Sequence, residues 1–305
     1  YLQQMNRATA LTGQPAGLWI PWTPNFMARR MVDGKWFSES SRPLTAPLTW
    51  FEFGIPVSAE RDGSSGTILA GDAVNAFSDE ELKELLSGAV FMDGQALEAL
   101  ADRGLAHLTG VRPEEKFELA SERLTDHKVN GRHAGEWRNV YFGAIGLNLE
   151  ITGQDVQVFS DLYDVESNKK GVCMTGYANE LGGRVVVMGY HPWERIGTLA
   201  KLFQIRETVD WATGKDIPLR MDPQARITAI VRTNAERSRV TAVLLNNSFD
   251  EVSEIPVILR ATLKKLVRLD PTGKTSPIEF KQKSEECHFN AGSIPPWQTV
   301  TIIGS

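Results

Sequence analysis

The hydrophobic pattern changes period several times between residues 67 and 104, and this is the clearest local signal in the chain. Thr67–Ala70 and Ala89–Met92 are short apolar runs with the length and composition of buried strands. Between them, Ser78 with Glu81 three residues later forms a capping-box sequence ahead of a helical stripe of leucines. A second amphipathic stretch follows and stops at Gly104. This order of strands and helices with short links predicts parallel strands joined by right-handed crossovers.

The chain between residues 117 and 165 is less regular, with strands predicted at 147–151 and 156–159. Val172–Leu181 and Arg184–Tyr190 predict a β-hairpin joined at Gly182-Gly183, because glycines supply the positive-φ positions of such turns. A helix is predicted from about Glu194 to Ala212. We interpret it as the last element of an α/β layer.

From about Pro218 the pattern changes to short β-branched segments separated by turn signals such as Asp270-Pro271-Thr272-Gly273. This spacing is typical of an antiparallel sandwich. The segments are Ile227–Val231, Val240–Leu245, Ile255–Leu259, Leu266–Leu269, Ile278–Phe280 and Thr299–Ile303.

Residues 1–56 are rich in aromatic side chains. Leu2–Leu11 predicts a helix, and Leu18–Trp22 predicts a short strand interrupted by Pro21. Leu48–Val57 alternates like a strand, with Trp50 and Glu52 on one face. The predicted organisation is therefore an N-terminal segment over residues 1–56, an α/β domain over 57–217 and a β-sandwich over 218–305.

Length and charge narrow the classes of protein. A chain of 305 residues is long enough for about two domains. Its net charge of −5 argues against a nucleic-acid partner, which calls for a basic face. No apolar run approaches the roughly 20 residues that span a bilayer, so no membrane association is predicted. Because Tyr1 leads directly into a predicted helix, we expect the natural N-terminus to lie upstream, which leaves the cellular compartment undetermined.

The segment Gly171–Gly176 resembles the G-x-C-x-G elbow of class I glutamine amidotransferases, and His191-Pro192 resembles their H-P-E. Thr175 replaces the second elbow glycine, and Trp193 replaces the glutamate. Cys173 and His191 also fall on two strands of one predicted hairpin rather than at a strand-to-helix turn. We therefore expect Cys173 to be a buried structural thiol, with thiol catalysis as the minor alternative. Cys173 and Cys287 are expected to be free rather than paired.

Other catalytic and cofactor signals are weak. The five histidines show none of the short spacings of metal sites, and phosphate-binding loops are absent from the sequence, so neither a metal nor a cofactor is predicted. Glu52, between aromatic neighbours, is the carboxylate with the surroundings best suited to a raised pKa. A catalytic role for Glu52 is nevertheless not predicted.

The tryptophans suggest carbohydrate contact, because indole rings stack on the apolar C–H faces of sugars. The candidate contacts are Trp19, Trp22, Trp36 and Trp50, together with Glu52. Packing of these rings in a core is the alternative.

Several short segments, in the same order along the chain, resemble the C-terminal half of bacterial glycoside hydrolases related to the β-galactosidase clan. They include Phe53–Val57, Leu69–Val74, Leu85–Asp93, Gly182–Tyr190 and Ile294–Trp297. The resemblance covers about residues 50–305. In that family a (β/α)8 barrel precedes an amidotransferase-like trimerisation domain and a small β-sandwich.

The resemblance implies an α/β fold: a flavodoxin- or amidotransferase-like parallel-sheet domain followed by a small antiparallel β-sandwich. Residues 1–56 would then include the tail of the barrel, and the catalytic carboxylates would lie upstream of Tyr1. No catalytic residue is predicted within this chain. The predicted function is that of a non-catalytic C-terminal region of a β-galactosidase-like exo-glycosidase, which forms a homo-oligomer and helps to wall the sugar site. The alternative is a stand-alone carbohydrate-binding or assembly module. The sugar, its linkage and the oligomer number are not predicted.

Overall fold

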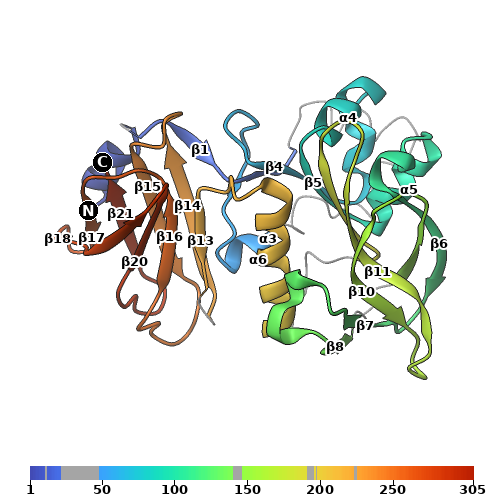
Figure 1. The fold of residues 1–305 in the computed structure, drawn as a ribbon. Coiled ribbons are helices and arrows are strands. Elements are labelled where there is room, and N and C mark those ends of the chain that lie inside the picture. Colours follow the sequence, from blue (N-terminus) through green and yellow to red (C-terminus); the bar gives the residue numbers. More distant parts are fainter. Residues whose placement is uncertain (11, 22–47, 140–145, 191–195, 197, 223–224) are drawn as a thin grey trace, which may run out of the picture. The chain divides into compact units, whose positions relative to one another are not determined.

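A computed structural model describes the chain except for residues 11, 22–47, 140–145, 191–195, 197 and 223–224 (Figure 1). The chain divides into two compact units. We call residues 1–19, 49–65 and 216–305 the sandwich unit, and residues 20–48 and 66–215 the mixed-sheet unit.

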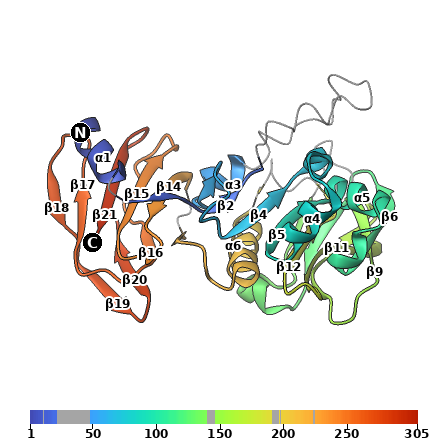
Figure 2. The ribbon, with the colours of Figure 1, turned by 90° about the horizontal axis from the view of Figure 1, so that it is seen from above.

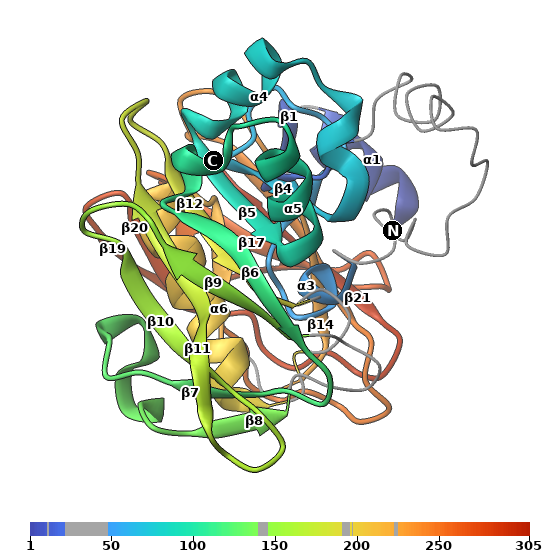
Figure 3. The same ribbon diagram turned by 90° about the vertical axis from the view of Figure 1, so that its right-hand side faces the viewer.

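In the mixed-sheet unit, three neighbouring strands run parallel: β4 (Gly66–Leu69), β5 (Ala89–Asp93) and β12 (Arg184–Met188). The sheet continues with antiparallel pairs through four further strands. Figure 3 shows β10 and β11 as long neighbours, with β7 and β8 beyond them. These strands are β11 (Lys169–Ala178), β10 (Gln157–Tyr163), β7 (Ser121–Leu124) and β8 (Trp137–Asn139).

The remaining elements of this unit are helices and a separate ribbon. The antiparallel ribbon consists of β6 (Val111–Phe117) and β9 (Gly146–Ile151). The helices are α4 (Asp79–Leu86), α5 (Gly94–Asp102) and α6 (Leu199–Thr213), with 3₁₀ turns at Gly71–Ala76, Ala106–Thr109 and Lys128–His133. The predicted capping box is confirmed, since Ser78 Oγ accepts from Glu81 N and Glu81 Oε2 accepts from Ser78 N.

The prediction of a flavodoxin-like parallel α/β domain is wrong. Of the described residues, 39% lie in strands and 23% in helices, and the sheets are mixed or antiparallel. The segment that supplies β7, β8, β10 and β11 joins its strands without crossover helices, and strands joined by hairpins pair antiparallel. The sequence predicted strands within β10 and β11 but none at β7 or β8, whose polar residues did not show a strand pattern.

The sandwich unit contains two antiparallel sheets. The six-stranded sheet has the order β1 (Gln14–Ala16), β14 (Ile227–Thr233), β15 (Val240–Asn246), β21 (Thr299–Gly304), β17 (Leu266–Leu269) and β18 (Thr275–Pro277). The four-stranded sheet has the order β13 (Leu219–Met221), β16 (Pro256–Arg260), β20 (Glu286–Asn290) and β19 (Phe280–Lys283).

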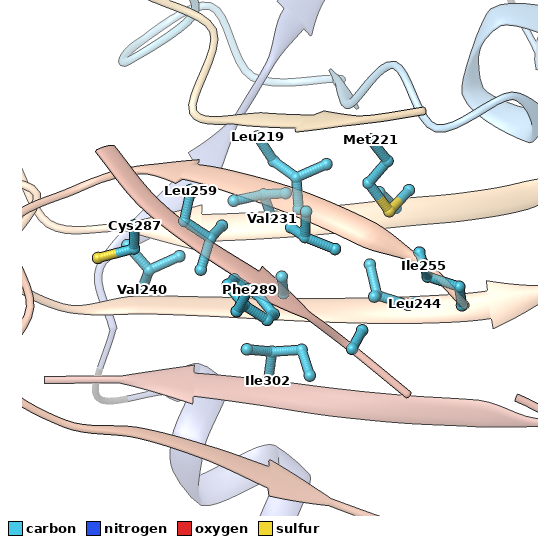
Figure 4. Close-up of a cluster of buried hydrophobic side chains, with 14 of the residues drawn as sticks. Leu219, Met221, Val231, Val240, Leu244, Ile255, Leu259, Cys287, Phe289 and Ile302 are labelled. Carbon is cyan, nitrogen blue, oxygen red and sulfur yellow. The ribbon is translucent and has the colours of Figure 1, made fainter. Parts of the chain in front are cut away.

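Alternating apolar positions of both sheets form one buried core in this unit. Val240 and Leu244 on β15 and Leu259 on β16 belong to this cluster, with Phe289 on β20 (Figure 4). Burying an aliphatic side chain of this size contributes roughly 1.5–3 kcal/mol. The core therefore accounts for five of the six strands predicted after Pro218. The predicted strand Ile278–Phe280 is wrong, because only Phe280 belongs to a strand.

The N-terminal part of the sandwich unit adds α1 (Leu2–Ala10), which Figure 2 shows beside β17 and β21. The Oη atom of Tyr1, just before the helix, lies 2.7 Å from Thr299 Oγ1 on β21. A short parallel pair, β2 (Leu18–Trp19) and β3 (Val57–Ser58), completes the unit.

The predicted strand over Leu48–Val57 is wrong, because Leu48–Glu52 forms the helix α3. The carbonyl of Trp50 accepts the backbone N–H groups of Phe53 and Ile55, which closes the helix, and Gly54 then turns the chain with φ at 81°. Alternation over so few residues does not separate a strand from one helical turn.

Candidate functional site

A buried carboxylate, Glu122, is the centre of a polar cluster inside the mixed-sheet unit. Alternation along β7 turns Glu122 and Leu124 inward and leaves Arg123 exposed. Glu122 has no exposed surface. Its Oε1 atom lies 2.7 Å from Nζ of Lys201 and accepts a 2.5 Å hydrogen bond from Ser160 Oγ, while Oε2 lies 2.8 Å from Nε of Arg138.

The polar cluster extends along α6 into a chain of amides. Lys201 Nζ donates to Gln204 Oε1 at 2.5 Å, and Gln204 Nε2 donates to Asn130 Oδ1 at 2.7 Å. The Nδ2 group of Asn130 donates to the carbonyls of Thr125 and Phe159, both at 2.8 Å. The cluster thus ties α6 to β7, β10 and the turn after β7.

Burial and opposite charges compete for the protonation states of the cluster. Burial by itself raises the pKa of Glu122, but Lys201 and Arg138 outweigh it and lower that pKa below the ordinary value. Burial lowers the pKa of Lys201 to about 8, although Glu122 acts in the opposite direction. The carboxylate is therefore ionised and forms ion pairs with both cations, which suits it to holding the unit together.

The thiol of Cys173 lies on β11, the strand next to β10, and is fully buried. This confirms the predicted buried thiol. Burial raises its pKa well above the ordinary value, and the charge of Glu122 raises it further. The pKa of the Tyr190 hydroxyl is also raised well above its ordinary value, by burial and by the charge of Glu122. A nucleophilic cysteine needs the opposite, a depressed pKa and access to substrate. His191, the proposed partner in thiol catalysis, lies outside the described residues.

The sequence did not single out Glu122, Arg138 or Lys201, because charged residues on short strands and helices are usually solvated. One available signal was the position of Lys201 between the apolar residues Ala200 and Leu202 in a helix. It was too weak to separate this lysine from the exposed ones.

The sequence-predicted sugar contacts that the structure describes lie in the sandwich unit. Trp19 and Trp50 are buried, at 5% and 1% exposure, and the guanidinium carbon of Arg61 lies 5.6 Å from the Trp19 ring. Glu52 is partly exposed and lies 3.8 Å from Arg226 Nη1. Trp22 and Trp36 lie outside the described residues. Sugar contact by this set stays a prediction.

Within the described part of the chain, no group of three or more His, Cys, Asp or Glu side chains is placed to hold a metal ion. None of its helices combines the length and apolar character needed to cross a membrane. Cys173 and Cys287 are both free thiols.

Comparison with protein-family models and with curated proteins gives no match. Solved structures do match. An α-L-fucosidase from Paenibacillus thiaminolyticus has a TM-score of 0.58 and 16% identity over 82% of this chain and 43% of its own. The GH42 β-galactosidase Gan42B from G. stearothermophilus has a TM-score of 0.55 and 13% identity over 96% of this chain and 40% of its own.

The β-galactosidase from Bacillus circulans sp. alkalophilus gives a TM-score of 0.54 at 13% identity and covers 99% of this chain. The fold is related to glycoside hydrolases. This chain spans about two fifths of the length of these structures, between 40% and 43%. At such low identity the likeness concerns the fold, and the activities named belong to those enzymes.

Proposed function

We propose that this chain is a non-catalytic C-terminal region of a glycoside hydrolase of β-galactosidase-like type, which serves oligomeric assembly and helps to wall the sugar site. The supporting observation is the alignment of 96% of this chain with 40% of a β-galactosidase. We expect such coverage if this chain corresponds to an accessory region of a larger enzyme, because almost the whole chain aligns with less than half of the enzyme.

The state of two buried carboxylates supports the non-catalytic part of the proposal. Asp93 is 1% exposed, and its oxygens accept the backbone N–H groups of Gly71 at 2.9 Å and Ala96 at 2.8 Å. Glu122 is held by Lys201, Arg138 and Ser160. Glycoside hydrolysis needs two carboxyl groups facing a sugar, roughly 5–9 Å apart. Carboxylates engaged in this way cap a helix and join secondary-structure elements.

The test uses the purified chain and chromogenic substrates. We expect no hydrolysis of 4-nitrophenyl β-D-galactopyranoside or 4-nitrophenyl α-L-fucopyranoside above the buffer rate. Light scattering at micromolar concentration should give a mass above the 33.8 kDa of one chain. Hydrolysis that disappears in Glu52→Gln would overturn the non-catalytic assignment, and a monomer would overturn the assembly role.

The intact mass of the native protein separates the proposal from a stand-alone binding module. A mass well above 33.8 kDa, with galactosidase activity in the native protein, supports the accessory role. A native mass equal to that of this chain favours the stand-alone module.

A further inference from the structure

Phe249 and Trp297 form an exposed aromatic pair in the sandwich unit. Their side chains are 85% and 59% exposed, and their ring centroids lie 5.5 Å apart at an interplanar angle of 81°. Phe249 follows β15 and Trp297 precedes β21, and these two strands are antiparallel neighbours. The pair therefore stands on two adjacent loops at one end of the six-stranded sheet.

A buried side chain, Asn246, joins these two loops. Its Nδ2 group donates to the carbonyls of Asp250 and Ile294, both at 2.8 Å, and its Oδ1 accepts the N–H of Ser248 at 2.8 Å. The backbone N–H of Trp297 donates to the Asn246 carbonyl at 2.9 Å. One fully buried amide thus sets the geometry of the loop that carries each ring.

The backbone of Trp297 is held in an unfavourable conformation. Its φ is 58°, in the left-handed region that bulky residues rarely occupy. A ring left this exposed contributes little to folding. Packing therefore does not explain why a tryptophan, rather than a glycine, occupies this backbone conformation. Strain that surrounding contacts maintain is found preferentially at functional positions.

Charged and polar groups adjoin the rings. The loop after β15 is tied to Arg226, whose backbone N–H donates to Ser248 Oγ at 3.2 Å and whose carbonyl accepts from Asn247 N at 2.8 Å. The Arg226 guanidinium, which is mostly exposed, lies 3.8 Å from Glu52. The same guanidinium lies 5.8 Å from the centroid of the Phe53 ring, so it is the backbone of Arg226 that contacts the loop carrying Phe249. Asp250 and Gln298, the residues next to each ring, are exposed as well.

The size of the pair indicates the class of ligand. Two aromatic side chains present at most about 150–250 Å² each, whereas a stable protein interface buries about 800 Å² on each partner. Charged and amide groups next to the rings suit the hydroxyl groups of a sugar, and the ring faces suit its C–H faces. A single sugar ring matches both the area and the chemistry.

We propose that Phe249 and Trp297 form a carbohydrate-binding platform, in which a sugar ring stacks on the face of one aromatic ring and lies against the other, with polar contacts from Asp250 and Gln298. The choice of galactose-containing sugars as probes rests on the proposed function. The platform itself rests on the aromatic pair and its loops.

The test is affinity electrophoresis of this chain in native gels containing soluble β-1,4-galactan, with β-1,3-glucan gels for comparison. Trp297→Gly is the decisive variant, because glycine adopts a φ of 58° without strain and the ring is removed. Phe249→Ala removes the second ring, and Trp297→Phe retains an aromatic ring. Trp137→Ala is the matched control, since Trp137 is 47% exposed and belongs to the other unit.

We expect galactan to retard the wild type, Trp137→Ala and Trp297→Phe. Trp297→Gly should raise Kd by about tenfold or more, with an unchanged thermal midpoint. Equal retardation of wild type and Trp297→Gly, or no retardation by either polysaccharide, would overturn the platform. A fall in light-scattering mass in Trp297→Gly with sugar binding intact would overturn it in favour of a protein interface. Loss of retention in Trp297→Gly supports the platform whether or not the native protein proves to be a galactosidase.

Discussion

The Nζ atom of Lys201 lies 2.7 Å from Oε1 of Glu122, and neither side chain has any exposed surface. This contact joins α6 to β7. Arg138 on β8 contacts Oε2, the other oxygen of the same carboxylate. Two buried cations around one buried anion leave an excess of positive charge when both are protonated. The lowered pKa of Lys201 is the consequence of its burial beside another cation.

Removing the carboxylate should strongly destabilise the mixed-sheet unit. Glu122→Gln keeps the shape of the side chain but leaves Lys201 and Arg138 without an anion. We expect the free energy of unfolding to fall by about 3–5 kcal/mol, measured by urea titration at pH 7. Glu98→Gln is the control, because the Glu98–Lys116 pair is partly exposed and should change stability by about 0.5 kcal/mol or less. Similar losses in both variants would contradict a central role for Glu122.

Stability should depend on pH through Lys201 in the alkaline range. Its pKa is about 8 in the folded chain and 10.5 at its ordinary value, so between these pH values the unfolded chain binds a proton that the folded chain has released. Stability from this group therefore rises as pH increases through that window. Relative to Lys201→Met, the wild type should gain about 2 kcal/mol between pH 7 and pH 9.5. Parallel pH profiles of the two proteins would refute the shift.

Cys173 should be inert in the native protein. Burial keeps reagents away from its sulfur, and the raised pKa keeps the thiol protonated. Cys287 is also buried and has a raised pKa. Incubation with N-ethylmaleimide should leave the folded chain unmodified by mass spectrometry, whereas unfolding in urea should yield two adducts. Rapid modification of Cys173 in the folded chain would reopen thiol chemistry.

Replacing either glycine of the β11–β12 turn by alanine should lower the stability of the protein, for a different reason at each position. A Cβ at Gly183 would lie 1.9 Å from the carbonyl oxygen of Leu86, a backbone atom that cannot move aside. A Cβ at Gly182 meets nothing within 4 Å, but its φ is 84°. We expect Gly183→Ala to cost about 3 kcal/mol or more and Gly182→Ala about 1 kcal/mol, from thermal unfolding by circular dichroism. The reverse order would contradict this assignment of steric and conformational costs.

Local features were determined by the sequence itself. The Ser78–Glu81 capping box, the hairpin around Gly182 and five of the six strands predicted after Pro218 form close to their predicted positions, because each depends on residues close in the chain. A cap, a turn and an alternating strand satisfy their own hydrogen bonds or bury one face with little reference to distant segments. The buried Cys173 was expected on a different ground, the mismatches of its segment with the amidotransferase motif.

Only the tertiary structure decided the direction of the strands in the mixed sheet and the place of its charges. Whether a strand pairs parallel or antiparallel depends on its neighbour and its connection, and the polar segment Ser121–Leu124 gave no sign that it joins the sheet. Glu122, Arg138 and Lys201 are far apart in sequence, and each alone has the pattern of a solvated residue. Desolvation is tolerated only because the three meet in space, and their meeting depends on the complete fold. The exposed pair of Phe249 and Trp297 depends in the same way on the adjacency of β15 and β21.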